Sequence, residues 1–138
     1  KAYDMGEVPV GSIIVFEKKI IAKAFNQIET LKDPTAHAEM MALTSAFASL
    51  ENKVLKGCSM YVTLEPCSMC AGAIVLSKLD NLYFGAYDNK AGACGSVLNI
   101  TNNPSLNHSV NVYGGILDTE CSSMLKFFFE SKRNTKLQ

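Results

Sequence analysis

Four residues in this chain of 138 have side chains that could together bind a metal ion and move a proton. His37 and Glu39 lie two positions apart in TAHAE, and Cys67 and Cys70 lie three positions apart in TLEPCSMCAGA. One imidazole and two thiolates suit a tetrahedral zinc ion, and three protein ligands leave the fourth position open to water, as in catalytic zinc sites. A carboxylate beside such a water can take and return its proton. These residues therefore predict a metal-assisted hydrolysis in which Glu39 carries the proton.

Both halves of this set are expected where a helix begins. The alternation in CSMYVTL predicts a strand over residues 58–64, and MCAGAIVLSK predicts a helix after it, so the cysteines lie at a strand-to-helix junction. Apolar residues at helical spacing predict another helix from Ala36 to near Gly57, with Asp33 as its N-cap. The histidine and glutamate then fall in its first turn. Two helix N-termini would face one point, where their partial positive charges would stabilise thiolates.

The remaining elements predict an α/β fold. SIIVF and IIAKA, joined by EKK, form a predicted hairpin, and NLYFGAY and VNVYGGI are predicted strands. A final helix is expected from Asp118. Because helices stand between the strands in this order, we expect a mixed sheet with helices on both faces.

Length and composition predict one domain over residues 1–138. The chain is 48% hydrophobic and 19% charged, and no apolar run approaches the roughly 18 residues of a membrane span, so a membrane protein is not expected. Thirteen basic and thirteen acidic residues cancel, which argues against a nucleic-acid binder held mainly by phosphate contacts. Five cysteines favour free thiols in a reducing cytoplasm. Since the chain opens on Lys1 rather than Met, we expect residues before it, including part of a first helix.

Two other interpretations of the cysteine pair compete with a catalytic metal site. A thioredoxin-like redox pair would leave TAHAE unexplained. A closed structural zinc site would need a fourth ligand, and the available residues have simpler explanations as small core residues, as a loop residue or as a loop hydrogen-bonder: Cys58, Cys121, Cys94 and His108.

The two short motifs together resemble a known signature. HAE followed by PCSMC is similar to the H-x-E and P-C-x-x-C motifs of zinc-dependent nucleobase and nucleoside deaminases. Over nearly the whole chain, EVPVG, DPTAHAEMMAL, TLEPCSMCAGAI, FGAYDNKAGACGS and NPSLNH resemble bacterial tRNA-specific adenosine deaminases. The last two blocks distinguish this group from deaminases of free guanine or cytosine.

The resemblance implies a fold and a reaction. The fold would be a cytidine deaminase-like three-layer α/β/α sandwich with a central mixed five-stranded sheet. One Zn²⁺ per subunit, held by His37, Cys67 and Cys70, would activate water as hydroxide. Glu39 would shuttle protons while the wobble adenosine of a tRNA anticodon becomes inosine.

The resemblance also implies residues that contact the substrate. Asn26 would bind the target nucleoside, Val8 would form a wall of the base pocket, and Asn107 would contact the base or its phosphate. The other implied contacts come from the backbone after the third strand and from the loop beside flanking nucleotides: Leu64, Glu65, Pro66, Asp88 and Lys90.

The implied partner is a tRNA anticodon stem-loop, bound by a homodimer. The basic candidates for RNA contact are Lys53, Lys56, Lys78, Lys132 and Arg133. The run 127–129 holds three phenylalanines that cannot all enter one core, so at least one is a candidate to stack on a base or to meet another chain. Two alternatives stay open: a deaminase of a free nucleobase or nucleoside, and a zinc-stabilised RNA-binding module without catalysis.

Overall fold

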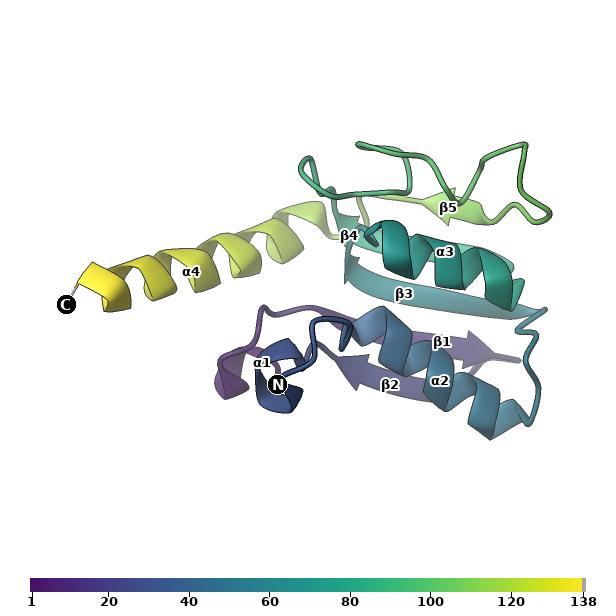
Figure 1. Cartoon of the computed structure of the whole chain (residues 1–138), viewed down its shortest axis with the longest axis horizontal. Helices are drawn as coiled ribbons and strands as arrows, with labels where there is room; N and C mark the ends of the chain where they lie inside the picture. Colours follow the sequence, from purple (N-terminus) through teal and green to yellow (C-terminus); the bar gives the residue numbers. More distant parts are fainter. Residues whose placement is uncertain (138) are drawn as a thin grey trace.

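The structure is a computed structural model that describes residues 1–137, with side chains placed as far as residue 134. A mixed sheet forms its centre, and two helices lie side by side on one of its faces (Figure 1). In chain order the elements are η1 (Tyr3–Met5), β1 (Gly11–Phe16), β2 (Lys19–Phe25), α1 (Ile28–Leu31), α2 (Ala38–Leu50), β3 (Cys58–Leu64), α3 (Ser68–Ser77), β4 (Asn81–Ala86), β5 (Asn111–Tyr113) and α4 (Asp118–Leu137).

The five strands are ordered β2-β1-β3-β4-β5 across the sheet. β1 is antiparallel to both β2 and β3, whereas β3, β4 and β5 are mutually parallel. The predicted mixed five-stranded sheet is therefore confirmed. Because β3 and β4 are parallel, their carboxyl ends lie at one edge, and the segments that leave them there can meet.

The predicted hairpin is confirmed, with a tighter turn than the sequence suggested. Phe16 pairs with Lys19, so only Glu17 and Lys18 connect the strands. Both have positive φ, at 50° and 65°, which is the geometry of a two-residue type I′ turn. Neither is the Asn or Gly that usually signals this turn.

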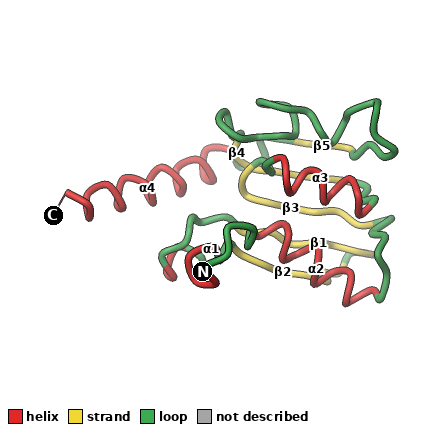
Figure 2. Tube along the Cα trace, in the orientation of Figure 1, coloured by secondary structure: helices red, strands yellow, loops and turns green. Residues whose placement is uncertain are grey.

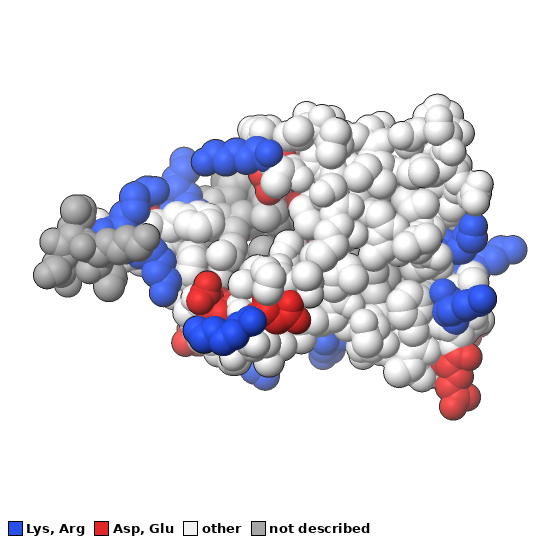
Figure 3. Space-filling model, in the orientation of Figure 1, with Lys and Arg blue, Asp and Glu red and all other residues white. Residues whose placement is uncertain are grey.

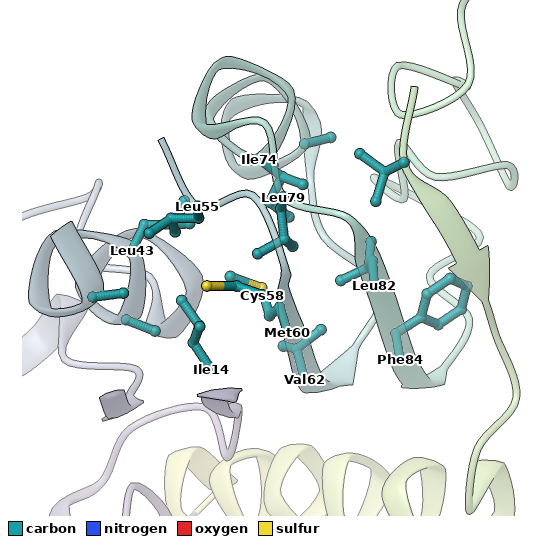
Figure 4. Packing of buried hydrophobic residues seen from close by; sticks show 14 of the residues in the cluster. Ile14, Leu43, Leu55, Cys58, Met60, Val62, Ile74, Leu79, Leu82 and Phe84 are labelled. Carbon is teal, nitrogen blue, oxygen red and sulfur yellow. The ribbon is translucent and has the colours of Figure 1, made fainter. Parts of the chain in front are cut away.

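The core lies between the sheet and the pair α2 and α3 (Figure 4). Alternate residues of β3, namely Cys58, Met60 and Val62, point into it, as the period-two pattern predicted. α2 packs on the sheet through Ala38, Ala42 and Ala46, all fully buried, together with Leu43. The small alanine face lets the helix approach the strands closely, which brings its N-terminus near that of α3.

α4 begins on the other face of the sheet. The Cys121 Sγ of α4 would lie only 2.4 Å from a Cβ placed on Gly85 of β4, so glycine allows the helix to contact this strand. The helix then extends past the sheet (Figure 1). On the same face the rings of Tyr61, Tyr83 and Tyr113 stack in a row across three strands, with centroids 4.6 and 4.9 Å apart. None of the helices in residues 1–137 combines the length and apolar character that a membrane span needs.

Two predicted details of the helices are wrong. The second helix covers Ala38–Leu50 rather than residues from Ala36 to near Gly57, because Glu51 adopts a left-handed conformation and ends it. Asp33 is not its N-cap, since the Asp33 carboxylate accepts hydrogen bonds from the N–H and hydroxyl of Thr35, before the helix. The short η1 and α1 elements were not predicted, because neither has a full period of apolar residues.

Candidate active site

The proposed metal ligands lie at the N-termini of two neighbouring helices. His37 is the N-cap of α2 and Cys67 is the N-cap of α3, both with extended backbone, and Cys70 follows in the first turn of α3. The loop before each helix thus aims one ligand at the space between the helix ends. The predicted convergence of two helix N-termini is present, although His37 precedes its helix rather than lying in the first turn.

The distances among the three side chains fit a tetrahedral zinc ion. The Nδ1 atom of His37 lies 3.6 Å from the Sγ atoms of both Cys67 and Cys70. Usual zinc bonds of about 2.3 Å to sulfur and 2.1 Å to nitrogen, at a tetrahedral angle, give a nitrogen–sulfur separation of about 3.6 Å. Within the side chains placed in residues 1–134, these three residues form the metal-binding group and no fourth side chain joins them. The donor set therefore fits zinc with one position left for water.

All five cysteines are free thiols, so Cys67 and Cys70 are not bonded to each other. A hydrogen bond from Cys70 and N–H groups at the start of α3 outweigh burial and lower the pKa of Cys67 to about 5. The same contact with Cys67, together with burial, raises the pKa of Cys70. Because the pKa of Cys67 lies well below neutral pH, this cysteine supplies a thiolate at pH 7.

Glu39 lies beside this group in the first turn of α2 and is only 4% exposed. Burial raises the pKa of Glu39 above its usual value, and its own backbone N–H and His37 act in the opposite direction. A carboxyl group with a raised pKa accepts a proton more readily than an exposed one and can give it back. The Glu39 side chain interacts with Cys70 and His37, so a titratable carboxyl group adjoins the three candidate ligands.

Asn26 and Val8 line a hollow of about 470 Å³ between the chain start, α1 and α4. Asn26 is 6% exposed, and its side-chain amide makes no hydrogen bond with any residue that the structure describes. Val8 also borders a second hollow of about 900 Å³, which Leu64, Asp88 and Lys90 line as well. Five of the predicted contact residues therefore surround two adjoining hollows.

Glu65 and Pro66 are buried and face the loop after β4 instead of these hollows. The Glu65 N–H donates to the carbonyl of Ala86, and the Pro66 carbonyl accepts from the N–H of Ala93. These backbone groups are thus engaged within the protein.

Asn107 is not brought to the site. It is exposed and lies four residues before β5, which begins opposite Asn81 at the amino end of β4. His108 fixes this loop there through a 2.7 Å contact between its Nε2 and the carbonyl of Leu79, consistent with the predicted role as a loop hydrogen-bonder. The long connection from the carboxyl end of β4 to the amino end of β5 is drawn in green in Figure 2.

Basic side chains lie around α4 and at the opposite end of the sheet, with others along the side of the molecule between them (Figure 3). Lys53, Lys56 and Lys78 follow the C-terminal ends of α2 and α3, about 15 to 20 Å from the metal ligands at helical rise. Lys132 and Arg133 line the two hollows. Lys126, which was not among the basic candidates, also lines the larger hollow. It lies seven positions before the candidate Arg133, on the same helix face, and that spacing was the available signal.

Comparisons with known proteins agree with this geometry. A profile of the MafB19-like deaminase family matches residues 1–133. The chain is 52% identical over 134 residues to a tRNA-specific adenosine deaminase of Aquifex aeolicus, covering 97% of this chain and 88% of that protein. It is 44% identical over 136 residues to the tRNA-specific adenosine deaminase of Bacillus subtilis, covering 99% and 84%.

Solved structures show the same relationship. A structure from a study of A-to-I editing by tRNA adenosine-34 deaminases at the wobble position has a TM-score of 0.85 and 38% identity, covering 89% of both chains. A guanine deaminase of Nitrosomonas europaea has a TM-score of 0.69 and 25% identity, covering 86% of this chain and 71% of that one. The chain therefore belongs to the MafB19-like deaminases and, among them, to the family of tRNA-specific adenosine deaminases.

Proposed function

We propose that this protein hydrolyses adenosine to inosine at the wobble position of a tRNA anticodon, and that residues 1–138 act as one deaminase domain. The observation that carries the proposal is the nearly equal spacing of the His37 Nδ1 from two cysteine sulfurs, with the buried Glu39 beside them. Such a site has the ligands for a metal, an open position for water and a group to move its proton.

The metal is zinc, one ion per chain, held by His37, Cys67 and Cys70. When bound there, zinc supplies a Lewis acid that makes water a nucleophile at neutral pH. The protein alone already brings these three side chains together. A hydrogen bond from Cys70 and the N–H groups at the start of α3 favour the thiolate form of Cys67, and the Nδ1 of His37 faces both sulfurs.

Glu39 moves the protons of the reaction. Its carboxylate takes a proton from the attacking water and gives it to adenine N1 as the new bond forms between oxygen and C6. A second proton passes through the same carboxylate to the exocyclic nitrogen. The bond from C6 to that nitrogen then breaks, and ammonia leaves as inosine forms.

The two hollows beside Val8 hold the target nucleoside and its neighbours. The free amide of Asn26 has both a donor and an acceptor for the nucleoside. Leu64 supplies apolar contact, and the loop with Asp88 and Lys90 lies beside the flanking nucleotides. Four basic side chains border these hollows and favour phosphates: Lys90, Lys126, Lys132 and Arg133.

An anticodon loop suits this site because its bases are already single-stranded and can enter a pocket without opening a duplex. Phe127 and Phe129 are 60% and 45% exposed, whereas Phe128 is buried. Phe127 stacks on Tyr3 and Phe129 packs edge-on against Phe128, and the exposed parts of these two rings are the surfaces that meet RNA or another chain. Five free thiols suit a reducing cytoplasm, where such a tRNA substrate would be found.

The active form is a homodimer in which both subunits contact the RNA. α3 presents Leu76, which is 81% exposed, on its outer face. A side chain at nearby Gly72 would meet no atom within 4 Å. Leu76 has the highest exposed fraction of the large apolar residues that the structure describes, so it is the first candidate for a subunit contact. Sedimentation velocity measures the number of chains in the particle.

The proposal is tested by incubating zinc-loaded protein with an anticodon stem-loop that carries a wobble adenosine, and separately with guanine, cytosine and adenosine. We expect inosine from the stem-loop and little ammonia from the free compounds. The guanine deaminases among the similar structures make the converse result informative. Turnover of a free base alongside an inert stem-loop would reject the tRNA substrate, and binding of the stem-loop without any turnover would leave an RNA-binding module.

A further inference from the structure

Glu65 is a buried acidic residue that the reaction does not use. It follows the last residue of β3 and precedes Pro66 and the ligand Cys67, and it is only 2% exposed. No basic side chain pairs with it, since the ion pair recorded for the described residues joins Lys32 and Glu29. A carboxylate buried in this way needs other partners.

Those partners all come from the loop after β4. Oε1 accepts hydrogen bonds from the N–H of Asp88 at 3.1 Å and from the hydroxyl of Ser96 at 2.5 Å. Oε2 accepts from the N–H groups of Cys94 and Ser96 at 3.0 and 3.1 Å. Four donors from positions 23 to 31 residues away thus converge on one side chain.

The loop is shaped to fit this carboxylate. A Cβ on Gly92 would lie 2.4 Å from the Glu65 Cδ, so only glycine allows the loop to pass there. The Asp88 side chain turns the chain before that point by accepting from the N–H groups of Lys90 and Ala91. After Gly92, the N–H of Ala93 donates a hydrogen bond to the carbonyl of Pro66. The loop is therefore tied to the segment 65–66 on both sides of Gly92.

The first part of this loop is a wall of the larger hollow. Residues 87–91 line that hollow together with Val8 and Leu64. We propose that Glu65 is a positioning residue, which fixes this wall for the nucleotides that flank the target base while contacting neither substrate nor metal. The inference rests on the proposed function and adds a residue that determines how the flanking nucleotides are held.

The test compares Glu65→Gln with the wild-type enzyme. A glutamine side chain has one oxygen, and its NH₂ group would face N–H donors. The loop should therefore lose about two of its four hydrogen bonds to position 65. We expect the KM for the anticodon stem-loop to rise about tenfold or more, with kcat within about threefold and zinc content unchanged. Gly92→Ala disturbs the same contact from the loop side and should give the same separation of KM from kcat.

Two controls separate positioning from general stability. Ser77→Ala removes the buried hydroxyl that bonds to the carbonyl of Ile74 and the N–H of Leu79, at the far end of α3. It should lower the melting temperature and leave both kinetic constants unchanged. Ser96→Ala removes one of the four donors and should raise KM by a smaller factor, which covers the case in which Glu65→Gln does not fold.

Amide hydrogen exchange provides a readout that does not need turnover. In the wild type the N–H groups of Asp88, Cys94 and Ser96 should be protected, and the Glu65→Gln variant should lose that protection. If the wild type makes no inosine, the proposed function fails and exchange alone tests the anchor. A fall in kcat with unchanged KM, a loss of zinc, or unchanged kinetics with only a lower melting temperature would each overturn the inference.

Discussion

Two regions of this protein use buried glutamates in opposite ways. At the metal centre Glu39 is 4% exposed, and burial raises its pKa above the usual value. We call the segments 5–8 and 87–91, which line the two hollows, the rim. There Glu7 is 1% exposed and accepts three hydrogen bonds, from the N–H of Glu29 and from the N–H and hydroxyl of Thr30. Glu65 accepts four in the same manner. Burial alone therefore does not tell what an acidic residue does.

The difference lies in the number of donors around each carboxylate. A buried carboxylate with few donors gains by holding a proton, and this suits proton transfer. A buried carboxylate surrounded by N–H and hydroxyl donors has its hydrogen-bonding capacity filled, and it organises the backbone that supplies them. Glu39 at the centre is thus suited to proton transfer, whereas Glu7 and Glu65 at the rim are suited to fixing the loops whose donors they bind.

The largest effect is expected at the centre, from Glu39→Gln. The variant keeps the size of the side chain but cannot carry a proton, so kcat on the stem-loop should fall by about 10² to 10⁴. Zinc content, measured by atomic absorption, should stay at one per chain. Glu51→Gln, at the exposed end of the same helix, is the matched control and should be fully active. Loss of zinc with loss of activity would place Glu39 among the ligands instead.

A second, smaller effect concerns the cysteines once metal is removed. With zinc bound, Cys67 and Cys70 should resist iodoacetamide, and a chelator should expose them. Because the pKa of Cys67 is lowered to about 5, its alkylation in metal-free protein should reach half its maximal rate near that pH. Cys94 is the control, since burial raises its pKa to about 12 and should leave it unreactive at neutral pH. Equal reactivity of Cys67 and Cys94 would contradict the lowered pKa of Cys67.

The comparison also explains what the sequence could predict. The centre is encoded locally: TAHAE and PCSMC each place ligands at the start of one helix, and strand and helix periods predict where those starts lie. The His37, Cys67 and Cys70 side chains accordingly meet in the structure as expected. The order of the predicted strands and helices is confirmed for the same reason.

The rim is encoded by contacts between distant positions. Nothing in the sequence near Glu65 shows that its donors lie 23 to 31 residues later, and Glu7 likewise meets Thr30 across 23 residues. The exposed position of Asn107 depends on the register of β5, a three-residue strand with little pattern. Single-chain patterns therefore predict which residues can react more reliably than which residues touch the substrate.

The smallest effect is expected at the rim, from Glu7→Gln. Burial raises the pKa of Glu7, but the Thr30 hydroxyl and the N–H groups of Glu29 and Thr30 outweigh it, so the net pKa is lowered from 4.5. The variant presents an NH₂ group to one of these donors, and the free energy of unfolding should fall by about 1 to 3 kcal/mol at pH 7. Thermal and urea unfolding at several pH values measure the difference.

The sign of the pH dependence distinguishes a charged anchor from simple packing. A lowered pKa in the folded state means that the charged form of Glu7 stabilises the protein above the usual pKa of 4.5. The stability gap between wild type and Glu7→Gln should therefore be full at pH 6 to 7 and shrink as the pH falls through the lowered value. Glu29→Gln is the matched control, because that side chain is exposed and its contact with Lys32 is a surface ion pair at 3.9 Å. A gap that stays constant down to pH 3 would mean that shape, rather than charge, holds this part of the rim.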